Sequence, residues 1–231
     1  MAKGKKYQVN SGLKILKTNQ ENIVIPTNEI IKQKGSNIIL LACISSISNV
    51  DDWSQAGGNS RYCSIQKLNN NLNYICNLLD VNRSKVMKDL RRLVDIGSDE
   101  FKLVKREYNG TEVACVEINY KSGGFVNIDN NILETLLSYN LSLNAFKLYT
   151  NLLWLCRDNI NNRYVERQLT QEYLLELIGL SKTSKRLLKK AEDELISFNL
   201  IQTKTEWVRK VGKDLNYSAP TQRKYYKIVT T

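Results

Sequence analysis

The chain has 231 residues, room for one large domain or for two of about 100 residues each. Hydrophobic residues make up 42% of it, enough to build real cores, so wholesale disorder is not expected. Lys and Arg number 34 against 23 Asp and Glu, a formal net charge of +11. That excess predicts a polyanionic partner, for which nucleic acid is the default candidate.

Several kinds of chemistry are disfavoured by the residue types. The chain contains no histidine, which removes Ser-His-Asp triads and imidazole metal ligands. Its five cysteines form no CxxC pair, and most lie in apolar text such as "LLACIS" and "YICNLL". We therefore expect reduced, mostly buried thiols. No cofactor and no metal are predicted.

No segment predicts a membrane association. The segment "MAKGKKYQVNSG" has no apolar stretch after its lysines, and the longest apolar run, "IILLACI", is too short to span a bilayer. We expect a cytoplasmic protein without a membrane partner.

The basic excess is uneven along the chain. Residues 1–20 carry five lysines and no acid, residues 21–122 carry 13 basic and 12 acidic residues, and residues 123–231 carry 16 and 11. A basic N-terminal arm over 1–20 is therefore predicted. Such an arm either follows a DNA groove or serves as a solubilising terminus.

The predicted elements follow one another in the same order twice. In the first copy, a short β-favouring run near residues 20–26 precedes Ile-rich helical text and the apolar helix in "NIILLACISSIS". A short helix and a longer amphipathic helix follow within 69–97. The β-rich text after them contains Asn109-Gly110, which predicts a tight hairpin.

The second copy repeats this order from residue 125. "FVNID" leads into the apolar helical text of 130–158, and a short and a longer helix follow within 169–201. The last element is a hairpin whose longer loop is predicted from about residue 211 to 223.

Helix, helix, turn, helix and hairpin is the order of a winged helix-turn-helix. We therefore predict a mainly helical α+β protein with two tandem winged helix-turn-helix domains. The polar, glycine-containing text "YKSGG" at 120–124 predicts the boundary between them. Domain 1 would cover 21–120 and domain 2 would cover 125–231.

The longer helix of the first copy has two different faces. At 3.6 residues per turn, one arc of roughly 100° is apolar, namely Val86, Leu90, Leu93 and Val94. The opposite side is basic, with Lys85, Lys88, Arg91 and Arg92, and Asp89 lies at its edge. Arg83 and Ser84 stand at the N-terminus, where backbone N–H groups favour a phosphate.

The longer helix of the second copy has the same pattern. Its predicted apolar arc contains Leu187, Leu188, Ala191 and Leu195. Its predicted basic face contains Lys182, Arg186, Lys189 and Lys190, with Lys185 beside it. A charged face on a single helix usually means solvation only. Here a nearly single-signed face follows a turn, precedes a hairpin and occurs twice, which favours contact with DNA.

Both predicted hairpins carry basic residues that would contact DNA backbone or minor groove. In the first hairpin these are Lys105 and Arg106. In the second they are Lys204, Arg209, Lys210, Lys213, Arg223, Lys224 and Lys227. The aromatic residues interleaved with them, Trp207, Tyr217, Tyr225 and Tyr226, are expected to complete the core instead.

An enzymatic activity is not expected. No glycine-rich phosphate-binding loop is present. Asp95, Glu100 and Lys102 fit a nuclease spacing only loosely, and such matches arise by chance.

The chain resembles the tandem winged-helix replication initiators of iteron-type plasmids and related phages. The segments "LLDVNRSKVMKDLRRLVDIG" and "LIGLSKTSKRLLKKAEDELISFNLI" carry the resemblance, together with the element order from "IVIPTNEII" to "KYYKIV". It implies that the C-terminal domain reads repeated origin sites in double-stranded DNA most strongly. The N-terminal domain would support a homodimer or add DNA contacts, and host replication proteins would be further partners.

Three other readings stay open at the level of the sequence. The same fold would serve a transcriptional regulator or a plasmid partition adaptor. It would also serve a module that binds other proteins. The third is a nuclease whose active site would use Asp95, Glu100 and Lys102.

Overall fold

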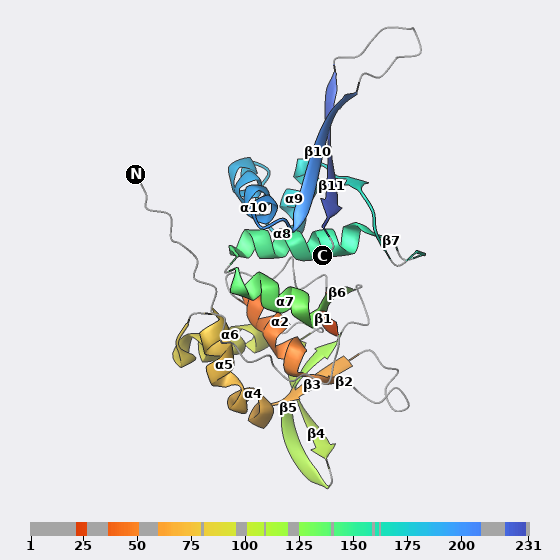
Figure 1. Ribbon diagram of the computed structural model, residues 1–231. Helices are drawn as coiled ribbons and strands as arrows, with labels where there is room; N and C mark the ends of the chain where they lie inside the picture. The colour runs from red at the N-terminus through yellow and green to blue at the C-terminus, as the bar shows by residue number, and fades with distance from the viewer. Residues whose placement is uncertain are drawn as a thin grey trace. The chain divides into compact units, whose positions relative to one another are not determined.

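The protein is an α+β protein whose chain forms two compact units, Met1–Leu143 and Asn144–Thr231 (Figure 1). The structure is a computed structural model. It describes residues 22–26, 37–50, 60–79, 81–95, 101–108, 110–119, 125–139, 141–158, 160–161, 163–208 and 220–229. The predicted N-terminal arm over 1–20 lies outside these ranges.

The described part of unit 1 contains helices, a four-stranded antiparallel sheet and a second sheet of two strands. In chain order they are β1 (Asn22–Pro26), α2 (Asn37–Ile47), β2 (Asn49–Val50), β3 (Ser60–Ser64), α4 (Ile65–Asn70), α5 (Leu72–Leu79), α6 (Arg83–Asp95), β4 (Phe101–Tyr108), β5 (Thr111–Asn119), β6 (Phe125–Asp129) and α7 (Asn130–Ser138). The strand order of the sheet is β2-β3-β5-β4. α2 is central, because it contacts α4, α5, α6 and β3.

Unit 1 extends past the boundary predicted at 120–124. Strand β6 pairs antiparallel with β1, and Ile23 stands opposite Ile128. Both of these side chains are buried. The strand that opens the second repeat is thus joined to the strand that opens the first. The division of the chain falls between Leu143 and Asn144.

Local sequence explains two further features of unit 1. Ser64 caps α4, because the backbone N–H of Lys67 donates to Ser64 Oγ at 3.1 Å. The predicted tight hairpin is confirmed, with Tyr108 opposite Thr111 at its end. Gly110 lies in that turn with φ of +75°, which glycine adopts without a steric cost.

Unit 2 begins with a long buried helix and ends with a long hairpin. Its elements are α8 (Leu143–Leu155), β7 (Arg157–Asp158), β8 (Arg163–Tyr164), β9 (Arg167–Gln168), α9 (Gln171–Leu177), α10 (Lys185–Ser197), β10 (Ile201–Val208) and β11 (Thr221–Ile228). Strands β10, β11 and β9 form a sheet in that order, and β7 pairs with β8. The connection of the hairpin runs from 209 to 220, so Arg223 belongs to strand β11 rather than to the predicted loop.

The two units share an arrangement of elements. In each, a 13-residue helix, α6 or α10, is followed by an antiparallel hairpin. The second hairpin strand, β5 or β11, also pairs with the strand that precedes the helices, β3 or β9. The bases of the two hairpins correspond as well, since Phe101 faces Ile118 and Ile201 faces Ile228.

The cysteines agree with the prediction from the sequence. All five are free thiols, and Cys43, Cys63, Cys115 and Cys156 are buried. Burial raises the pKa of Cys43 and of Cys63 to about 12. None of the helices in the described ranges is both long and apolar enough to cross a bilayer.

Candidate nucleic-acid interface

Helix α6 is anchored by its first residues and by its apolar side. The backbone N–H of Lys85 donates to Asn82 Oδ1 at 2.8 Å, so the Asn82 side chain caps the helix. Val86, Leu90 and Leu93 are buried, and Val94 is half-buried. The predicted apolar arc is therefore confirmed.

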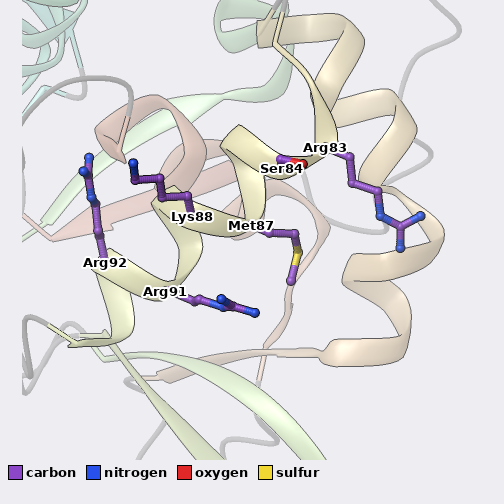
Figure 2. A pocket seen from close by; sticks show the side chains of 6 residues that line it. All are labelled: Arg83, Ser84, Met87, Lys88, Arg91 and Arg92. Atoms are coloured by element: carbon purple, nitrogen blue, oxygen red, sulfur yellow. The ribbon is translucent and has the colours of Figure 1, made fainter.

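Four of the five cations of α6 lie on its outer side. Arg83, Lys88, Arg91 and Arg92 are exposed. Together with Ser84 and Met87 they line an open hollow of about 690 Å³. Figure 2 shows Lys88 and Arg92 pointing to one side of the helix and Met87 and Arg91 to another, with Arg83 and Ser84 at the first turn. The hollow is thus bordered by four positive charges.

Lys85 does not belong with these outward cations. It is partly buried, and its Nζ donates to Oδ2 of Asp89 one turn further on. Asp89 is buried rather than at the edge of the exposed face, and Arg92 Nη1 lies 3.9 Å from its Oδ1. The i,i+4 spacing allows Lys85 to neutralise a carboxylate that the core has taken out of water.

The first hairpin is not a basic surface. Lys105 Nζ lies 2.9 Å from Glu112, Lys102 Nζ lies 3.3 Å from Glu117, and the Arg106 guanidinium lies 3.6 Å from the centre of the Tyr62 ring. Near the tip, Glu107 stands directly opposite Glu112. The hairpin thus carries as many carboxylates, Glu107, Glu112 and Glu117, as β4 carries cations, and it has no basic excess. The prediction from Lys105 and Arg106 did not take these carboxylates into account.

Helix α10 presents a similar face with one difference from the prediction. Leu188, Ala191 and Leu195 are buried, whereas Leu187 is 45% exposed. Successive helical residues are turned by about 100°, so Leu187 lies at one edge of the predicted arc and Leu188 at the other. The apolar side of α10 is therefore narrower than predicted.

The predicted cations of α10 and of the turn before it are all exposed, namely Lys182, Lys185, Arg186, Lys189 and Lys190. Lys189 Nζ lies 2.7 Å from Asp193, and this hydrogen bond raises the lysine pKa. Lys185 Nζ lies 3.8 Å from Glu172 of α9. In the ranges that the structure describes, no carboxylate forms an ion pair with Arg186 or Lys190.

A buried charged cluster joins α10 to the second hairpin. Glu192 is fully buried and accepts hydrogen bonds from Lys224 Nζ and from the Tyr226 hydroxyl. The Lys224 side chain is 18% exposed, so its charge is used inside the unit rather than on the outer surface. Sequence reasoning missed this cluster and placed Lys224 among the DNA contacts. One signal was available, since Glu192 stands at the same distance from the helix start as buried Leu90 in α6.

The other predicted cations of the second hairpin lie in several settings. Lys227 is exposed, Arg223 is half-buried opposite Glu206, and Lys204 Nζ lies 2.6 Å from Glu206. Arg209, Lys210, Lys213 and Tyr217 lie outside the described residues.

The aromatic residues of this hairpin divide into two groups. Tyr226 is fully buried, as predicted, and Tyr225 is half-buried. Trp207 is 68% exposed, so the prediction that it completes the core is wrong.

The described residues show no group of three or more His, Cys, Asp or Glu side chains that could hold a metal ion. Of the loose nuclease spacing, Glu100 lies outside the described residues and Lys102 pairs with Glu117. Compared with known proteins, the chain matches no family model and no curated protein.

Proposed function

We propose that the chain is a sequence-specific double-stranded DNA-binding protein built from two winged helix-turn-helix units. The order of elements and of sheet strands in each unit supports this assignment. In this reading α6 and α10 are the recognition helices, and the β4–β5 and β10–β11 hairpins are the wings.

The observation that carries the proposal is the shared construction of α6 and α10. Each has 13 residues, one buried apolar side and an outer side with exposed cations. An α-helix fits the major groove of B-form DNA, where its side chains reach base edges and phosphates. The occurrence of such a basic face twice in one chain favours a binding role over a face that is charged only to contact water.

The two units would contribute unequally. Unit 2 presents exposed cations on the turn before α10, on α10 and on β11, whereas Lys102 and Lys105 of the first hairpin are each paired with a carboxylate. Unit 2 should therefore supply most of the specific affinity, and unit 1 should add phosphate contacts through α6.

The biological role that we propose is replication initiation at repeated origin sites of a plasmid or phage, with a homodimer and host replication proteins as partners. The two-unit organisation and the resemblance of the two helix-turn-helix segments to such initiators support it. A transcriptional regulator with the same fold would bind DNA equally well but would need no repeated sites.

A footprint on the DNA that flanks the gene tests the proposal. We expect protection of direct repeats of about one to two helical turns each, because each recognition helix reads one major-groove segment. Protection of a single operator at a promoter would favour the regulator. A matched control is Arg163→Ala, which removes an exposed cation paired with Asp158 outside α6 and α10 and should leave the footprint unchanged.

A further inference from the structure

The register of the second hairpin fixes the side on which Trp207 lies. Residues directly opposite one another in an antiparallel pair share a face, and every second residue returns to it. Thr203 faces Tyr226, Thr205 faces Lys224 and Trp207 faces Gln222. Trp207 therefore lies on the same face of the hairpin as Lys224 and Tyr226.

That face is the one turned toward α10, because Lys224 and Tyr226 both bond the buried carboxylate of Glu192. Trp207 lies two residues beyond Thr205 along β10, about 7 Å at the usual rise of a strand. Figure 1 shows the β10–β11 hairpin standing beside α10 and extending past it. The indole is thus carried beyond the contact with the helix, and it is 68% exposed there.

The position of the first hairpin that corresponds to Trp207 carries an acidic side chain. Both hairpins start from matching pairs, Phe101 with Ile118 and Ile201 with Ile228, so Glu107 corresponds to Trp207. Glu107 stands opposite Glu112, which would repel a phosphate backbone. Unit 2 instead has an aromatic ring opposite a neutral amide, that of Gln222.

We propose that Trp207 inserts into the minor groove of the DNA, beside the major-groove segment that α10 occupies. The indole would pack on deoxyribose and base edges, as apolar wedges of minor-groove binders do. This inference rests on the proposed function. It adds a contact that reads groove width and deformability to the base contacts of the helix.

The test uses the full chain with Trp207 as the sole tryptophan, made by Trp53→Phe and Trp154→Phe, and the duplex recovered by footprinting. On binding, the emission of Trp207 should be quenched and its quenching by acrylamide should fall. In the otherwise natural chain, Trp207→Ala should weaken binding about tenfold and Trp207→Phe much less. Ile160→Ala, which removes a side chain that is 92% exposed in the same unit, is the control and should change nothing.

A minor-groove ligand such as netropsin locates the contact. It should weaken binding of the natural chain more than binding of Trp207→Ala. Equal effects of netropsin on both, or DNA binding that leaves Trp207 emission and accessibility unchanged, would overturn the inference while the DNA-binding function stands. If Trp207 becomes less accessible to acrylamide when the protein concentration is raised without DNA, it lies in a contact between copies of the chain. That result would also overturn the inference. If the natural chain binds no duplex at all, the proposed function fails as well.

Discussion

Single residues on the two proposed recognition helices differ in what they can do. A guanidinium can bond guanine O6 and N7 together, whereas an ammonium acts as a point charge suited to phosphate. Arg186 is in the first turn of α10 and has no carboxylate partner in the described ranges. Lys190 is similarly exposed one turn later. Under the proposed function, Arg186 would therefore read a base and Lys190 would contact phosphate.

We expect Arg186→Ala to cost about 1–3 kcal/mol on the recognised duplex and to relax the preference at one base pair. Lys190→Ala should weaken recognised and scrambled duplexes alike. Binding series on both duplexes would measure this. The assignment fails if Arg186→Ala weakens both duplexes equally while Lys190→Ala changes the base preference.

On α6, the outward cations should serve DNA and not the fold. Lys88→Ala with Arg91→Ala should weaken DNA binding without lowering the melting temperature, because both side chains are exposed on the side away from the buried arc. The matched control is Lys105→Ala, which removes a cation already paired with Glu112. An equal loss of affinity from the control would show that only total charge matters.

At the scale of elements, the relation between α10 and the second hairpin depends on a buried carboxylate. Glu192 of α10 is bonded by two side chains of β11, and at the equivalent place α6 has Leu90. Replacing one partner of a buried ion pair leaves the other charge uncompensated, which costs about 3–5 kcal/mol. The same cluster sets the position of the hairpin beside the helix.

Lys224→Met should therefore lower the free energy of unfolding and also weaken DNA binding, although Lys224 itself is nearly buried. Lys227→Met, which removes an exposed cation of the same strand, should leave stability unchanged. Urea unfolding and duplex binding of both variants make the comparison. Stability that is unaffected by Lys224→Met would mean that the cluster does not hold the two elements together.

Local periodicity predicted the helices and hairpins far better than it predicted the contacts between them. The apolar arc of α6, most of that of α10, the tight turn at Gly110 and the buried thiols follow from spacing and residue type alone. The pairing of β1 with β6 joins residues about a hundred positions apart. The hydrophobic alternation of one strand does not show which other strand it pairs with. Lys105 and Lys224 were predicted as DNA contacts, but each is paired with a carboxylate, Glu112 and Glu192 respectively. The sequence could not show this, because charge along a helix or strand does not reveal the charge packed against it.

For the molecule as a whole, buried cysteine and tyrosine side chains determine how the stability changes at alkaline pH. Burial raises the pKa of Cys43 to about 12 and of Cys156 to about 11, and it also raises the pKa of Tyr149 and Tyr226 above the ordinary value of 10.0. In the unfolded chain these groups lose protons from about pH 9 upward, while in the folded chain they keep them.

The free energy of unfolding should therefore be steady near pH 7 to 8 and fall as the pH rises above about 9. Chemical unfolding across pH 7 to 11 measures this, and Cys43→Ala should reduce the steepness of the decline. A stability that stays flat to pH 11 would contradict the burial of these groups.

The proposed function depends on binding of duplex DNA through the cations of α6 and α10. Its most direct test is the dissociation constant for the footprinted duplex measured across a range of salt concentrations. We expect a steep linear fall of log affinity with log salt, because phosphate contacts release counterions. Arg83→Ala with Lys88→Ala, and separately Lys190→Ala, should reduce the slope by about one unit per cation removed. An affinity independent of salt, or a slope that these variants leave unchanged, would contradict it.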